Sequence, residues 1–259
     1  MDIKNIEAII FDMDGVLWRA YQPIGDLRSM FQVLNDNKIK YVFASNNATI
    51  HTSTYFEKIQ AFGIPVTLDQ IFTSGKVTAE VLSERFPSGG NVYIVGENGL
   101  QKTLSEKGFT HSEENVLAVV GGLDFDINYS KLDIAARLIR NGAPFIGTNP
   151  DLTFPTPDGP SPGAGTVLAA IQAASGFAPD VIGKPQPYMF DQALQYLGTS
   201  ASRTLVIGDR LETDIACGQN TGCLTAVVLT GVTSRQMAEA WRPAPDLIAD
   251  DLASIIKMI

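Results

Sequence analysis

Short apolar runs without polar alternation recur along this chain, and stretches with helical spacing separate them. The clearest runs are Ala8–Phe11, Tyr41–Ala44 and Leu205–Ile207. A strand without a polar face is buried on both sides, and intervening helices bring the chain back to the same edge of a sheet. The sequence therefore predicts an α/β fold built on a parallel sheet that helices cover on both faces. Further strands are predicted at Ile71–Phe72 and Ala226–Leu229, and helices at Met30–Asn37, Thr52–Phe62 and Lys76–Phe86.

The middle of the chain repeats this pattern as a separate set of βα units. Turn-rich stretches at Pro87–Gly90 and Gly176–Pro179 suggest its limits. We therefore predict a core of residues 1–80 and 181–259 with an inserted α/β domain of residues 81–180. The insert is expected to have strands at Val92–Val95, Leu117–Val120 and Pro144–Gly147 and helices at Leu100–Lys107, Leu132–Ile139 and Thr166–Ala174.

Composition and charge exclude several classes of protein. The net charge of −9 argues against a nucleic-acid surface, which needs a basic stripe. The longest apolar runs are far too short to span a bilayer, and the charged first residues do not resemble a signal peptide. Two cysteines, Cys217 and Cys223, lie outside any CxxC pattern, so we expect neither zinc nor disulfides and a reducing, cytoplasmic setting.

Acidic residues follow two of the predicted core strands. Asp12 and Asp14 come directly after Ala8–Phe11, while Asp209 and Asp214 follow Leu205–Ile207. A single acid in such a place is often only a turn or helix-cap residue. Two acid-ended strands side by side would instead form an oxygen-rich cage where ligands of parallel sheets gather. Mg²⁺ prefers such hard oxygen ligands, so the pattern predicts a magnesium site.

Two polar segments complete the pattern. Lys184 lies between a glycine and a proline before a predicted helix, and by itself it could be an ordinary exposed lysine. Ser45, Asn46 and Asn47 follow the strand Tyr41–Ala44, where they could cap the next helix. Hydroxyl and backbone N–H groups at such a place are also suitable donors to phosphate oxygens.

In this order and at these intervals, the four segments resemble the motifs of the haloacid dehalogenase superfamily. They are Asp12-Met13-Asp14-Gly15-Val16, Ser45-Asn46-Asn47, Gly183-Lys184-Pro185 and Gly208-Asp209-Arg210 with Asp214. The long insert is similar to the larger α/β cap (C2 type) of subfamily IIA, which holds p-nitrophenylphosphatases and the phosphoglycolate and pyridoxal phosphate phosphatases. The resemblance spans about residues 6–255 and implies a Rossmann-like core with an inserted cap.

The resemblance also implies catalytic roles. Asp12 would be the nucleophile, and Asp14 would be the general acid and base. Ser45 would hydrogen-bond the transferring phosphoryl group, and Lys184 would neutralise charge. Elementary chemistry agrees, because a carboxylate can form an acyl phosphate and thereby split one difficult step into two.

Binding roles follow from the same resemblance. Mg²⁺ would be held by Asp12, Asp209 and the main-chain carbonyl of Asp14, with Asp214 supporting the site from outside this ligand set. Asn46 and Asn47 would complete the phosphate-binding loop with Ser45 and Lys184.

The stretch Asn149–Gly165 has five prolines and is expected to be a loop that faces a site. It matches the position of the substrate-specificity loop in subfamily IIA caps. Our hypothesis is that Asn149, Asp151 and Phe154 read the part of the substrate beyond the phosphate. The alternative is that Asn149 and Asp151 only hold the loop by side-chain to backbone hydrogen bonds.

The interpretation that results is a magnesium-dependent phosphatase that acts on a small phosphorylated metabolite, with no nucleic-acid or membrane partner. A homodimer through the cap is an expectation by family analogy. A dehalogenase would not need the second acid, and a P-type pump would need membrane helices. A phosphomutase shares the core chemistry, and a catalytically idle binding protein would not need the full acid set. For Trp18, a place in a substrate cleft and a place in the core stay open, and His51 and His111 are expected at the surface or in loops.

Overall fold

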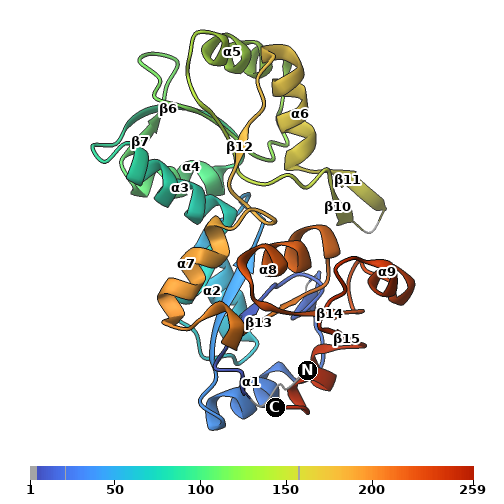
Figure 1. The fold of residues 1–259 in the computed structure, drawn as a ribbon. Coiled ribbons are helices and arrows are strands. Elements are labelled where there is room, and N and C mark those ends of the chain that lie inside the picture. Colours follow the sequence, from blue (N-terminus) through green and yellow to red (C-terminus); the bar gives the residue numbers. More distant parts are fainter. Residues whose placement is uncertain (1–4, 21, 157) are drawn as a thin grey trace. The chain divides into compact units, whose positions relative to one another are not determined.

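The structure, a computed structural model, describes residues 5–20, 22–156 and 158–259 (Figure 1). The chain divides into two compact units. The first consists of Met1–Ser45, Ser53–Phe72 and Lys184–Ile259, and the second of Asn46–Thr52 and Thr73–Gly183. The limits differ from the predicted ones in two places. The second unit begins at Thr73 and not at residue 81 because helix α3 (Ser74–Arg85) packs on α4 (Asn98–Glu106), and it also includes Asn46–Thr52.

The first unit is built on a six-stranded sheet with the order β15-β14-β13-β1-β4-β5. All residues of its central strand β1 are buried, as are those of β13, which agrees with the expected lack of a polar face. The chain runs from β1 outward to β4 and β5 and then returns to β13 on the other side of β1. The switch point thus lies between β1 and β13, and the predicted α/β class is confirmed. The strands are β1 (Ala8–Phe11), β4 (Lys40–Ser45), β5 (Ile71–Thr73), β13 (Thr204–Gly208), β14 (Leu224–Val228) and β15 (Leu247–Ala249).

Helix α1 (Leu27–Asp36) shows how local sequence and core packing agree in this unit. Asp26 caps its N-terminus by accepting a hydrogen bond from the backbone N–H of Ser29 at 3.1 Å. Its buried side chains recur at helical spacing, and Phe31 packs on Phe11 of β1 with 5.1 Å between ring centroids. The other helices are α2 (Thr52–Ala61), α7 (Tyr188–Leu197), α8 (Ala216–Thr221), α9 (Arg235–Ala240) and α10 (Leu252–Ile256), and a short ribbon pairs β2 (Trp18–Arg19) with β3 (Gln22–Pro23).

The second unit has its own parallel sheet, with the order β12-β9-β8-β6-β7, and its own hydrophobic core. Helix α5 (Tyr129–Arg140) packs on α6 (Ala164–Ser175), as Figure 1 shows. This is the predicted inserted α/β domain, and its βα units confirm the fold class. The strands are β6 (Gly90–Val95), β7 (Phe109–His111), β8 (Val119–Gly121), β9 (Phe145–Gly147) and β12 (Asp180–Val181).

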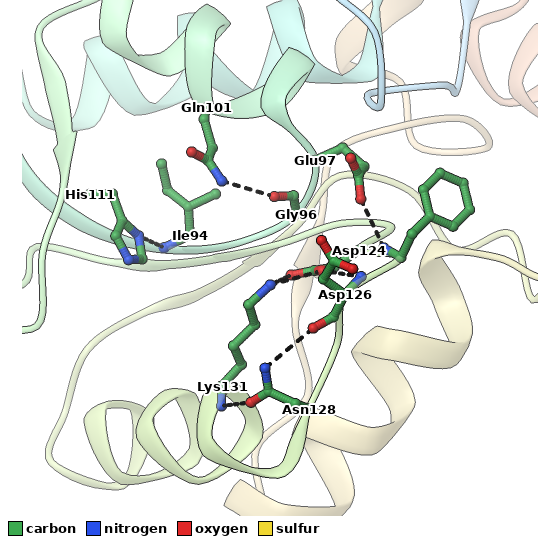
Figure 2. A network of polar contacts seen from close by, with 10 residues as sticks. Ile94, Gly96, Glu97, Gln101, His111, Asp124, Asp126, Asn128 and Lys131 are labelled. Carbon is green, nitrogen blue, oxygen red and sulfur yellow. Dashed lines mark hydrogen bonds and ion pairs between the residues drawn. The ribbon is translucent and has the colours of Figure 1, made fainter.

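Polar contacts fix the loops at the carboxyl edge of this second sheet (Figure 2). Asp124, only 4% exposed, accepts two hydrogen bonds from the ammonium of Lys131 at 2.7 and 2.9 Å. Glu97, which follows β6, accepts a hydrogen bond from the backbone N–H of Phe125 at 2.8 Å. Asn128 caps α5. The loop between β8 and α5 is therefore held at both ends.

The proline-rich stretch contains secondary structure that the sequence did not indicate. Within it, β10 (Thr153–Thr156) and β11 (Gly159–Pro162) form an antiparallel ribbon in which Pro155 lies opposite Pro160. In a two-stranded ribbon, each strand has one side without a partner strand. Proline is tolerated where its nitrogen faces that side, because no N–H is needed there for pairing. Pro157, in the same stretch, lies outside the described residues. Within the described part of the chain, no helix has the length and apolar character needed to cross a membrane.

Candidate active site

The carboxyl ends of three neighbouring strands of the first unit carry the predicted catalytic groups. Asp12 directly follows β1, and its backbone N–H donates to the carbonyl of Ile207 in β13 at 2.8 Å. Ser45 ends β4 and is 5% exposed, while Asp209 directly follows β13. Because all three strands are parallel and adjacent, these residues meet at one edge of the sheet.

Lys184 joins this group from another part of the chain. Its side chain is buried, and its ammonium donates to Asp12 Oδ1 at 2.7 Å, Asp214 Oδ1 at 2.6 Å and the Ala44 carbonyl at 3.0 Å. Burial alone would lower the pKa of Lys184, but the charges of Asp12 and Asp214 outweigh it and raise the pKa. The lysine is therefore a permanent cation beside the Asp12 carboxylate, and the alternative of an ordinary exposed lysine is wrong.

Three carboxylates form a cluster that can hold a metal ion. One oxygen each of Asp12, Asp209 and Asp214 lie within 4.8 Å of one another. Burial, opposed by Lys184, raises the pKa of Asp12 well above its ordinary value, with the charges of Asp214 and Asp209 adding to the rise. Burial and the charge of Asp214 raise the pKa of Asp209 to about 6. Such crowded, desolvated carboxylates suit a hard divalent cation that takes oxygen ligands.

Asp214 is held on both of its oxygens. Oδ1 accepts from Lys184, and Oδ2 accepts from the backbone N–H of Arg210 at 3.1 Å. Asp214 is 1% exposed, and it packs so closely on Gly208 that a Cβ there would lie 2.1 Å from the Asp214 Cβ. The predicted role was only to support the site from outside the metal ligands. These contacts are compatible with it and indicate that Asp214 orients Lys184.

A loop that the sequence analysis did not single out holds Asp209. The backbone N–H of Val232 donates to Asp209 Oδ2 at 2.7 Å, and Thr230 Oγ1 donates to the Gly15 carbonyl at 2.6 Å. Gly231 lies so close that a Cβ on it would be 1.8 Å from Asp209 Oδ2. The signal in the sequence was a threonine and a glycine shortly after β14, the next strand of the sheet.

Asp14 is exposed and oriented by a buried tryptophan. The indole N–H of Trp18 donates to Asp14 Oδ1 at 2.7 Å, and Trp18 itself is fully buried. Its ring stacks with Tyr55 at 6.4 Å between centroids, and the ammonium of Lys58 lies 4.0 Å from the Trp18 ring centroid. Of the two interpretations of Trp18, the place in the core is therefore confirmed, and its polar edge serves the predicted acid and base.

Asn46 and Asn47 belong to the second unit, although they directly follow Ser45. Asn46 Nδ2 donates to Asp151 Oδ2 at 2.9 Å. Asn47 Oδ1 accepts from both the backbone N–H and the hydroxyl of Thr49, each at 2.7 Å. Both side chains thus shape the loop after β4, and their contact with substrate stays a prediction.

The three predicted specificity residues do not form one group. Asn149 is 5% exposed, and its Nδ2 donates to the Asn46 carbonyl at 2.6 Å while its Oδ1 accepts from the Asp151 backbone N–H at 3.2 Å. Phe154 is half-buried, and its ring meets Phe125 at 6.2 Å between centroids. Phe125 is 64% exposed and was not among the sequence candidates.

The histidines and cysteines have structural roles. His51 pairs with Glu106 at 3.0 Å, and His111 Nδ1 accepts from the backbone N–H of Ile94 at 3.0 Å (Figure 2). Burial lowers the pKa of His111. Cys217 and Cys223 are buried free thiols.

Two models of known families match the chain. A haloacid dehalogenase-like hydrolase model matches residues 9–110, and a HAD-hydrolase-like model matches residues 181–255. Among curated proteins, 5'-nucleotidase YutF of Bacillus subtilis is 34% identical over 99% of this chain and 100% of its own length. An acid sugar phosphatase of Staphylococcus epidermidis is 34% identical over 96% of each chain.

Solved structures agree with these relatives. A 4-nitrophenylphosphatase from Thermotoga maritima has a TM-score of 0.93 at 33% identity and covers 99% of this chain and 98% of its own. A p-nitrophenyl phosphatase from Archaeoglobus fulgidus has a TM-score of 0.93 at 32% identity, with 98% of this chain and 99% of its own covered. The similarity therefore extends over both units.

Proposed function

Because this chain belongs to the haloacid dehalogenase-like hydrolases of subfamily IIA and is a phosphoric monoester hydrolase, we propose that it hydrolyses small-molecule phosphomonoesters through an aspartyl-phosphate on Asp12. One observation carries the proposal. Asp12 lies at the end of the central strand, in contact with the Lys184 ammonium and in a cluster with Asp209. A mostly buried carboxylate in this position is a nucleophile whose charge is compensated as it approaches an anionic ester.

The proposed cofactor is Mg²⁺, held by the carboxylates of Asp12 and Asp209 and the main-chain carbonyl of Asp14. The oxygen-only donor set and the mutual repulsion of the clustered carboxylates support this choice. When bound, the ion supplies positive charge that offsets repulsion between Asp12 and the phosphoester and favours in-line geometry.

The first chemical step forms a bond between the Asp12 carboxylate and phosphorus and breaks the ester P–O bond. Asp14 gives its proton to the leaving alkoxide. Ser45 donates a hydrogen bond to the transferring phosphoryl group, and Lys184 balances charge on Asp12 and the phosphate. The exposed carboxyl of Asp14 suits this role because Trp18 fixes its orientation while leaving it accessible.

The second step hydrolyses the acyl phosphate. Asp14, now a carboxylate, takes a proton from a water molecule that attacks phosphorus, and the bond between phosphorus and the Asp12 oxygen breaks. Inorganic phosphate leaves, and both carboxyl groups return to their starting protonation states. The same residue thus serves as acid in one step and as base in the next.

For the substrate, we propose sugar phosphates or nucleotides, since similar proteins are named acid sugar phosphatase and 5'-nucleotidase. Phe154, together with Phe125, offers a flat apolar contact for a sugar or base, and neither ring can take part in proton transfer. We therefore assign to this aromatic pair the recognition of the leaving group.

The proposal is tested by trapping the intermediate. Enzyme mixed with substrate and Mg²⁺ is quenched with acid, and mass spectrometry should find a phosphoryl group on the peptide that contains Asp12. Pretreatment with EDTA should remove both the adduct and the release of inorganic phosphate, and added Mg²⁺ should restore them. Turnover without an adduct on Asp12, or full activity after metal removal, would contradict the mechanism. Transfer of phosphate to a sugar instead of water would identify the phosphomutase alternative.

A further inference from the structure

Two of the proposed catalytic residues are covalent neighbours of residues that belong to the second unit. Ser45 is followed by Asn46, and Lys184 is preceded by Gly183. Within the second unit, both of these neighbours are hydrogen-bonded to one short segment after β9, Thr148–Asp151. Within the second unit, the segment therefore holds both residues through which the chain continues from Ser45 and returns to Lys184.

Asn46 is held on both its backbone and its side chain. Its carbonyl accepts from Asn149 Nδ2 at 2.6 Å and from the hydroxyl of Ser74. Its own Nδ2 donates to Asp151 Oδ2 at 2.9 Å. These bonds join residues more than a hundred positions apart, so they fix the loop after β4 against the end of β9.

Gly183 is packed just as closely. Its backbone N–H donates to the Thr148 carbonyl at 2.8 Å. A Cβ at this position would lie 2.6 Å from that carbonyl oxygen and 2.8 Å from Asn46 Oδ1. Only glycine allows this approach. Within the second unit, Asn46 and Gly183 are thereby held beside one another.

Asn149 has little hydrogen-bonding capacity left for a ligand. It is 5% exposed, its Nδ2 serves the Asn46 carbonyl and the Thr148 hydroxyl, and its Oδ1 accepts from the Asp151 backbone N–H. A residue that read the substrate would instead present a free donor or acceptor. The contacts therefore favour a part in holding the phosphate-binding loop.

We propose that Asn149 and Asp151 are positioning residues for catalysis, which fix Asn46 and thereby set the position of Ser45. Through Thr148, the same segment also holds Gly183, next to Lys184. This inference rests on the proposed function, because it assigns the effect to the proposed roles of Ser45 and Lys184. It predicts an effect on the chemical step that is the same for all substrates, since every phosphoester presents the same phosphoryl group.

The experiment compares Asn149→Ala and Asp151→Ala on p-nitrophenyl phosphate, a sugar phosphate and a nucleoside monophosphate. Because misplacement by about 1 Å can slow a reaction roughly 10²-fold, kcat should fall by about 10- to 100-fold, by the same factor for each substrate. The ranking of substrates and the affinity for Mg²⁺ should not change. Asp151→Asn keeps an oxygen that can accept from Asn46 Nδ2, and it should restore most of kcat.

The matched control is Asn128→Ala in the same unit, which removes the cap of α5 without a contact to Asn46. It should lower the thermal midpoint while kcat stays near that of the wild type. Asp151 is only partly buried, so Asp151→Ala provides a folded variant even if Asn149→Ala unfolds. A changed substrate ranking, or a loss of kcat no larger than in the control, would overturn the inference. Neither result would affect trapping of phosphate on Asp12, so failure of the proposed function is recognised separately.

Discussion

The carboxyl edges of the two parallel sheets carry very different chemistry. In the first unit this edge holds buried charges, with Asp12, Asp209 and Lys184 in one cluster. In the second unit the same edge holds an ion pair, buried Asp124 with Lys131, together with the neutral amide of Asn149 and the exposed ring of Phe125. The same topology thus positions the proposed reacting centre in one unit, and in the other it positions loops that are proposed to hold the phosphate-binding loop and to recognise the substrate.

The sharpest test of this comparison is to remove the proposed nucleophile. We expect Asp12→Asn to lower kcat by about 10⁴-fold or more, as found when a covalent catalyst is deleted, while circular dichroism shows an intact fold. Release of inorganic phosphate from p-nitrophenyl phosphate measures the effect. Asp36→Asn, which makes the same charge change at an exposed position of α1, should leave the rate unchanged. Substantial residual activity in Asp12→Asn would contradict the proposal that the reaction takes place at the strand ends of the first unit.

Replacement of Asp14 tests the acid role that is proposed for it at the carboxyl edge of the first sheet. Because Asp14 is proposed to protonate the leaving group, Asp14→Asn should slow hydrolysis of alkyl phosphates by about 10²- to 10⁴-fold. The p-nitrophenolate leaving group needs less protonation, so its ester should suffer less in single-turnover measurements of the first step. Equal losses for both esters would contradict the acid role, and Trp18→Phe should show the same selectivity more weakly.

The loop over Asp209 is expected to act through the metal site. In Gly231→Ala the added methyl group would have to displace the Asp209 carboxylate. We expect Mg²⁺ affinity, measured by calorimetry, to fall by about 10- to 100-fold, the range found for changes that disturb ligand orientation. Gly75→Ala, where φ is not positive and a Cβ would meet no atom closer than 3.4 Å, tests whether loss of a glycine alone has this effect. An unchanged Mg²⁺ affinity in Gly231→Ala would show that this loop does not support the metal site.

The aromatic pair of the second unit should affect substrate choice and not the covalent step. Phe154→Ala and Phe125→Ala are expected to raise KM for a nucleoside monophosphate by about tenfold, the effect of losing one apolar contact. Hydrolysis of p-nitrophenyl phosphate, a small substrate, should hardly change. Tyr129→Ala removes a more exposed ring from the same unit and serves as control. An unchanged ranking would place specificity elsewhere in the insert.

The smallest expected effect is on stability against pH. Folding raises the pKa of Asp209 from an ordinary value of 3.8 to about 6, so the folded state holds this proton more tightly than the unfolded state. The stability that results is fully present below pH 3.8 and is lost as pH rises through 6, where Asp209 becomes charged in the folded state. Bound Mg²⁺ should compensate for this loss, and the rise in thermal midpoint with Mg²⁺ should be larger at about pH 7.5 than at about pH 5. Asp209→Asn should weaken the pH dependence of the metal-free protein. An equal Mg²⁺ effect at both pH values would contradict the repulsive cluster.

Much of the fold follows from local pattern. Strands such as Ala8–Phe11 and helices such as Thr52–Ala61 are where apolar runs, helical spacing and turn residues indicate them, because these preferences act over a few residues. The ribbon of β10 and β11 was missed because prolines usually argue against strands, and its pairing depends on where each proline's nitrogen faces.

The amino-acid sequence by itself determined the α/β class and the residue types at the catalytic strand ends, with Asp12, Ser45 and Asp209 following apolar runs. Only the tertiary structure decided which distant groups serve them. It brought Lys184 to Asp12, placed Val232 on the Asp209 carboxylate and joined Asn149 to Asn46. The physical reason is that hydrogen bonds and ion pairs between residues far apart in the chain depend on how strands order and loops pack, which no local spacing of residues encodes.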